Sequence, residues 1–141
     1  MYDSREVLTS LLKAAQRGQT VIRSVLDQAM DTELADILKD QLQELMEIES
    51  ESRSLASQRG WELEELKLAE RFLSDRRSRR KLRFEESNSA IAELMIQSNI
   101  KTKILGLKAL HGYPAGNGIS ILSQKLIDCQ TTTIQQLESF L

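Results

Sequence analysis

Apolar residues recur every three or four positions along four segments of this chain, which is the spacing of amphipathic helices. The pattern predicts helices over about 4–30, 32–59, 89–110 and 120–141. An aromatic content of only 4% and a single proline also favour helix over sheet. The four apolar stripes are, in chain order, Leu8, Leu11, Ala15, Ile22 and Val25; Leu34, Leu38, Leu42, Leu45 and Ile48; Ile91, Leu94, Met95 and Leu105; and Leu122, Leu126, Cys129, Leu137 and Phe140.

Residues that start and stop helices stand at the ends of these segments. Asp3, with Glu6 three places later, resembles a capping box, and Gly60 is placed to end the second helix. The run 111–114 contains a glycine and a proline and therefore terminates the third helix. Gly18 interrupts the first apolar stripe, which indicates a close approach of another helix. The turn between the first two helices is very short, so we expect them to be antiparallel neighbours.

Residues 61–86 join the second helix to the third with a patchy amphipathic pattern, which we interpret as a partly helical crossover. At about 1.5 Å per residue, a helical segment of this length spans a whole bundle. The third helix would then run parallel to the second. We expect a single all-α domain over 1–141, a four-helix bundle with ferritin-like connectivity. A simple up-down bundle stays the alternative.

The third predicted helix is apolar on more than one side. One track contains the residues of its stripe above, and a second track contains Ile96, Ile100, Ile104 and Leu107. A helix of this kind is central in its fold or buries its second face against another subunit. The pattern therefore predicts a homo-oligomer formed through the third or the fourth helix.

The most distinctive stretch is IAELMIQS at 91–98, which follows the polar residues ESNS at 86–89. Together with IQQLE at 134–138, it resembles an uncharacterised family of small bacterial ferritin-like four-helix-bundle proteins. The similarity covers nearly the whole chain. The chain departs from the family in its more basic connector and in SNIK at 98–101, where the family is rich in glycine. The resemblance implies a fold, and it implies no activity, cofactor or functional residue.

The net charge is −2, but one basic cluster stands within the acidic chain. Phosphate groups of nucleic acid or an anionic membrane surface would suit such a cluster. It lacks the interleaved aromatic residues on which bases stack, and glutamates flank it on both sides. We therefore expect a solvated connector or a charge partner for the acidic second helix, and neither nucleic acid nor a membrane surface as partner. The cluster consists of Arg76, Arg77, Arg79, Arg80, Lys81 and Arg83.

The chain has no apolar run of the roughly 18 residues that a transmembrane helix needs. Its first residues lack the apolar core of a signal peptide, and its single cysteine, Cys129, fits a reducing compartment. These features predict a cytoplasmic protein without a transmembrane segment.

Catalytic and metal-binding motifs are missing from the sequence. A di-iron bundle needs two Glu-x-x-His motifs, and this chain has one histidine, His111, at a predicted helix end. Glu47, Glu51 and Glu93 are the least implausible metal ligands, and we expect them on the solvated surface. Cys129 lies on an apolar track, where a buried thiol is inert. We therefore expect no enzyme, no metal site and no cofactor.

Several amide and hydroxyl side chains lie near the apolar tracks and would need hydrogen-bond partners if they were buried. They predict an interior polar network that fixes helix register or binds a small ligand. Its members are Gln16, Gln19, Gln41, Gln97 and Ser98. The sequence as a whole favours a non-enzymatic interaction or structural protein. We expect it to form a homo-oligomer, and a different protein is a second candidate partner. The alternative is an atypical ferritin-like protein that binds a metal or a small ligand.

Overall fold

The computed structural model describes residues 3–29, 31–67 and 88–141. Within them it contains four helices and no strand, which confirms the all-α prediction. The helices are α1 (Ser4–Leu26), α2 (Thr32–Gln58), α4 (Asn88–His111) and α5 (Gly118–Glu138).

Side-chain caps define where three of these helices begin. Asp3, Asp31 and Asn117 each accept a hydrogen bond from a backbone N–H of the first turn, which satisfies a donor that has no partner inside the helix. Gly60 follows α2 with a φ of 70°, the left-handed conformation predicted for a glycine that ends a helix. The caps at Asp3 and Asp31 confirm the predicted helix starts.

Three predicted helix ends are wrong. α1 ends at Leu26 instead of continuing to residue 30, because Gln28 and Ala29 donate to the carbonyls three residues before them and so tighten the chain into a turn. α5 begins at Gly118, two residues early, because the Asn117 side chain accepts the N–H of Ile119 at 2.9 Å. α5 ends at Glu138 instead of residue 141, because Phe140 and Leu141 donate to the carbonyls three residues before them.

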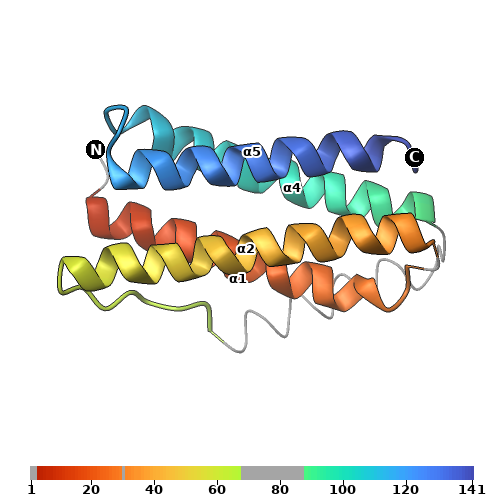
Figure 1. The fold of residues 1–141 in the computed structure, drawn as a ribbon, viewed down its shortest axis with the longest axis horizontal. Helices are drawn as coiled ribbons and strands as arrows, with labels where there is room; N and C mark the ends of the chain where they lie inside the picture. The colour runs from red at the N-terminus through yellow and green to blue at the C-terminus, as the bar shows by residue number, and fades with distance from the viewer. Residues whose placement is uncertain (1–2, 30, 68–87) are drawn as a thin grey trace.

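The four helices form two antiparallel hairpins that pack side by side (Figure 1). α1 packs against α2 and α4 against α5, while α2 also contacts α5 and α1 contacts α4. α2 ends at the left of Figure 1 and α4 begins at the right, so these two helices run parallel. The connection between them must therefore return along the length of the bundle, as the predicted crossover requires.

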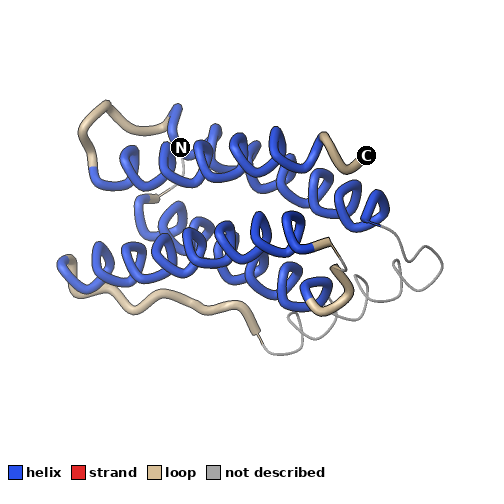
Figure 2. Tube along the Cα trace, turned by 45° about the vertical axis from the view of Figure 1, so that its right-hand side comes forward, coloured by secondary structure: helices blue, strands red, loops and turns tan. Residues whose placement is uncertain are grey.

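The first part of the crossover is not helical. The 61–67 segment runs as an irregular chain from the end of α2 back along the α1–α2 hairpin (Figures 1 and 2). Trp61 donates its N–H to the Ala56 carbonyl at 2.9 Å, and Leu66 is buried with 3% of its surface exposed. The rest of the predicted 61–86 crossover, residues 68–86, lies outside the described residues.

One apolar core fills the space between the hairpins. Among its fully buried side chains are Leu11, Ile22, Leu38, Ile48, Met95 and Leu122, which come from all four helices. Gly18 confirms the predicted close approach, since a Cβ there would lie 2.8 Å from Cδ1 of Leu45 on α2. Gly106 likewise allows α4 and α5 to approach closely, since a Cβ there would lie 3.0 Å from the Ile127 side chain.

Candidate functional site

The side of α4 opposite the core carries a row of exposed residues, which we call the α4 stripe. At 3.6 residues per turn these positions fall within an arc of about 80°. Two large apolar side chains lie at its centre, Ile100 with 45% and Ile104 with 48% of the surface exposed. The stripe consists of Glu93, Gln97, Ile100, Ile104, Lys108 and His111.

The two apolar tracks predicted on this helix therefore have different surroundings. On the first track, Ile91 and Met95 are buried against the other helices. On the second track, Ile96 is only partly buried, and Ile100 and Ile104 face outward. In the described part of the chain, Ile100 and Ile104 are thus left uncovered, whereas Ile96 packs against the core.

Charge is divided unequally along the α4 stripe. Glu93 lies near the N-terminal end of the helix, whereas Lys108 and His111 lie in its last turn. The helix macrodipole favours this order, with an acid near the N-terminus and bases near the C-terminus. The two isoleucines lie between the charged ends, so the stripe reads acid, apolar, base.

A groove of about 520 Å³ runs beside the stripe, between the first part of α1 and the last part of α4. Its floor includes Val7 and Ala109, which are 8% and 7% exposed. Lys101, Lys108 and Glu6 also line it, as does Tyr113, whose hydroxyl lies 3.1 Å from Ser4 Oγ. The groove can therefore take an apolar group next to two ammonium groups and one carboxylate.

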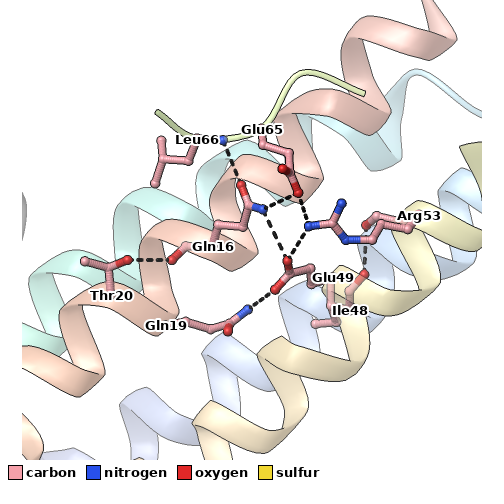
Figure 3. A network of polar contacts seen from close by, with 9 residues as sticks. Gln16, Gln19, Thr20, Ile48, Glu49, Arg53, Glu65 and Leu66 are labelled. Carbon is pink, nitrogen blue, oxygen red and sulfur yellow. Dashed lines mark hydrogen bonds and ion pairs between the residues drawn. The ribbon is translucent and has the colours of Figure 1, made fainter. Parts of the chain in front are cut away.

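A second polar feature joins α1, α2 and the 61–67 segment (Figure 3). The Gln16 amide donates to Glu49 at 3.2 Å and accepts the backbone N–H of Leu66 at 2.8 Å. Gln19 donates to Glu49 at 2.8 Å, and Arg53 forms ion pairs with both Glu49 and Glu65. These contacts fasten the 61–67 segment to the hairpin. We call this group the Glu49 cluster.

Glu49 is ionised in this cluster. Burial raises the pKa of its carboxyl group. The hydrogen bonds from Gln19, Arg53 and Gln16 together lower the pKa by more than burial raises it, so the pKa lies below its ordinary value. A carboxylate whose oxygens accept three donors serves as a structural anchor. Its partners among the described residues are two amides and a guanidinium group, none of them a histidine or a carboxylate.

Three amides meet in the interior of the bundle, separate from the Glu49 cluster. Gln41 Nε2 donates to Asn99 Oδ1 at 2.8 Å and to Gln130 Oε1 at 2.7 Å, and all three side chains are at least 97% buried. They come from α2, α4 and α5, so one donor ties three helices together. The Gln41 oxygen and the Asn99 amide nitrogen have no partner among the described residues.

The predicted single interior network is therefore wrong in its membership. Gln16 and Gln19 belong to the Glu49 cluster, and Gln41 belongs to the buried amide trio. Gln97 is exposed on the α4 stripe, because its position falls on the face of α4 opposite the core. Ser98 is only partly buried, and its carbonyl accepts the Thr102 hydroxyl at 3.0 Å.

The sequence pattern missed Glu49, Asn99 and Gln130. Glu49 follows Ile48, one position off the apolar stripe, and looks like a surface acid in one dimension. The signal that could have found it is the antiparallel register of the first hairpin. Gly18 approaches Leu45, and one turn further along α2 this register brings Glu49 to Gln16 and Gln19, which lie on either side of Gly18.

The other predicted positions lie as follows. Glu47 and Glu93 are exposed and Glu51 pairs with Lys125, while His111 is exposed at the end of α4. The described residues include no group of three or more His, Cys, Asp or Glu side chains placed to hold a metal ion. The basic cluster, Arg76, Arg77, Arg79, Arg80, Lys81 and Arg83, lies outside the described residues.

Cys129 is buried, with 3% of its surface exposed. Burial, with a smaller effect of Glu44, raises the pKa of its thiol, so the group stays protonated at neutral pH. This agrees with the prediction of an unreactive thiol.

Comparison of the chain with protein-family models, with curated proteins and with solved structures found no match. The ferritin-like family stays a prediction from the sequence. In the described part of the chain, no helix combines the length and the apolar character that crossing a bilayer requires.

Proposed function

We propose that this chain is a non-enzymatic interaction protein that associates with a second copy of itself through the α4 stripe. Ile100 and Ile104 carry the proposal, because each is nearly half exposed in the middle of a long helix. An exposed apolar group framed by polar residues is typical of a protein–protein contact. In the Glu49 cluster, Arg53 pairs with both Glu49 and Glu65 and Gln16 donates to both, an arrangement of structural ion pairs that supports the non-enzymatic part.

The test is the mass of the protein in solution, measured by light scattering and sedimentation over a wide concentration range. We expect a dimer for the wild type and a monomer for Ile104→Asp and Ile100→Asp, because a charge at the centre of the contact would be desolvated. Circular dichroism checks that each variant keeps its helices.

Ile121→Asp is the matched control. Ile121 is 58% exposed on α5, so the change adds the same charge at an equally open isoleucine on another helix. It should leave the dimer intact. Loss of the dimer in this variant alone would place the contact on α5, and a wild type that stays monomeric would contradict the proposal.

The groove supports a second candidate function, the binding of a small amphipathic carboxylate. An apolar floor next to Lys101 and Lys108 suits an acyl chain with an acidic end. Ser10 lines the groove but lies off the α4 stripe. Ser10→Trp should therefore abolish binding of a medium-chain fatty acid, measured by calorimetry, and should leave the oligomeric state unchanged. Ile100→Asp should abolish the dimer and leave the binding of the fatty acid unchanged.

A further inference from the structure

We infer that the second copy binds antiparallel and in one register, with Glu93 of each chain against Lys108 of the partner subunit. This inference rests on the self-association proposed above and specifies its geometry. The observation behind it is the order of side chains along the α4 stripe.

The two possible orientations of the partner helix differ in their electrostatics. A parallel copy would bring Glu93 against the partner's Glu93 and Lys108 against the partner's Lys108. An antiparallel copy brings opposite charges together at both ends, and a two-fold axis makes the two contacts identical. The antiparallel orientation also places the positive end of each helix macrodipole beside the negative end of the other, which is favourable. The stripe is complementary to itself in this orientation alone.

The register follows from the spacing of the charges. Glu93 and Lys108 are 15 residues apart, which is about 22 Å along a helix. Opposing them places the two-fold axis between Ile100 and Lys101. Each Ile104 then lies opposite the partner's Gln97 and each Ile100 opposite the partner's Lys101, so the two Ile100 side chains lie on either side of the axis, about 1.5 Å apart along the helix direction.

The centre of this contact is apolar and its ends are charged. The methylene groups of Lys101 add apolar surface while its ammonium group stays in water. Glu93 and Lys108 are both exposed, so the charge pairs form at the rim of the contact. Charges at a rim select the partner and its orientation more than they add affinity.

The experiment that tests the register is a charge exchange between two variants. Glu93→Lys alone and Lys108→Glu alone each create two repulsive pairs in the homodimer, so we expect each to weaken the homodimer by about tenfold. Mixed together, the two variants place opposite charges at both ends. We expect the mixture to form a heterodimer about as tight as the wild-type dimer.

The matched controls are Glu33→Lys and Arg23→Glu. Glu33 lies in the first turn of α2 and Arg23 in the last turn of α1, so these reversals disturb a helix end in the same way without touching the stripe. Neither should weaken the dimer, and their mixture should behave as each variant does alone.

Cysteine cross-linking gives a second measurement, independent of the charges. Ile100→Cys places a thiol beside the proposed axis, so air or a short bifunctional reagent should link two chains. Ser89→Cys, also exposed on α4 but far from the axis, should not be linked. Cys129 is buried, so the wild-type chain provides an unlinked background.

The outcomes separate the two proposals. A wild type that is monomeric at every concentration overturns the proposed function and the register with it. A dimer that is lost on Ile104→Asp but does not respond to the charge exchange, or that links through Ser89→Cys instead of Ile100→Cys, overturns the antiparallel register and leaves self-association intact. Restoration in the mixture together with linking at position 100 supports both.

Discussion

Gly18 shows how a single residue sets the distance between two helices. The structure leaves no room for a side chain there, because Leu45, which a Cβ would approach to 2.8 Å, is itself completely buried. Gly60 has open space around it, and its constraint is the positive φ alone. The two glycines are needed for different physical reasons.

We predict that Gly18→Leu lowers the free energy of unfolding by about 2–3 kcal/mol, since α1 and α2 must separate to admit the side chain. Gly60→Ala should cost about 1 kcal/mol, from backbone strain without a clash. Urea denaturation followed by circular dichroism measures both. Equal effects of the two substitutions would contradict this assignment of causes.

The buried amide trio gives a second prediction at the scale of single residues. Gln41→Leu removes the donor shared by Asn99 and Gln130 and leaves two buried oxygens without it, so we expect a loss of about 2–3 kcal/mol. Replacing all three amides by leucine leaves no polar atom unpaired. The free energy of unfolding of the triple variant should lie within about 1 kcal/mol of that of the wild type. A triple variant less stable than Gln41→Leu would show that the trio is stabilising as a unit.

Among the elements, the 61–67 segment depends most on polar contacts. Besides the Glu49 cluster, Arg5 donates to the Glu62 carbonyl at 2.8 Å, and Lys13 lies 3.4 Å from the Glu64 carboxylate. The segment has no backbone ladder to hold it in place. It also carries Trp61, the single tryptophan of the chain, so tryptophan fluorescence reports on this segment specifically.

We predict that Glu49→Gln destabilises the protein by about 1–2 kcal/mol at neutral pH, because the variant loses an ionic acceptor for three donors. The pKa of Glu49 is lower in the folded chain than its ordinary value of 4.5. The ionised Glu49 therefore stabilises the fold fully at pH values above 4.5. The contribution is lost as the pH falls through the lower pKa of the folded state. The difference in the free energy of unfolding between the wild type and Glu49→Gln should therefore shrink as the pH falls over this range.

Trp61 fluorescence and circular dichroism, each recorded against urea at several pH values, measure this effect on the segment and on the helices. Asp36→Asn, which removes an exposed acid of α2 outside the Glu49 cluster, is the control and should unfold as the wild type does. A gap between wild type and Glu49→Gln that widened on acidification would contradict the predicted sign.

How far the sequence predicts this molecule depends on the range of the interaction. Helices follow from local periodicity, and the starts at Asp3 and Asp31 follow from single capping residues. The end of α1 was misplaced because Ala29 continues the apolar spacing although the chain has already turned. Contacts between elements, such as Gln16 with Glu49 or Gln41 with Gln130, depend on helix register and rotation, which one sequence does not specify. The apolar second face of α4 was visible in the sequence, but the exposed position of Ile100 and Ile104 required the packed bundle.

For the whole molecule, self-association predicts that thermal stability depends on protein concentration. A partner that binds only the folded chain stabilises it by mass action. For a chain of this size we expect the Tm to rise by about 2 °C for each tenfold increase in concentration. Ile104→Asp should remove this dependence and Ile121→Asp should keep it, as measured by scanning calorimetry. A wild-type Tm independent of concentration would argue against the dimer.

The path of the chain also determines the electric field of the bundle. α1 and α5 begin at the end of the molecule where α2 and α4 finish (Figure 1). The four most extensive contacts between helices are therefore antiparallel, whereas the small contact between α1 and α5 joins parallel helices. Around either end of the bundle, partial positive and partial negative charges of about half a unit alternate and largely cancel. The helix dipoles alone therefore give almost no net field to an ion that approaches along the long axis, and any attraction at the ends comes from charged side chains.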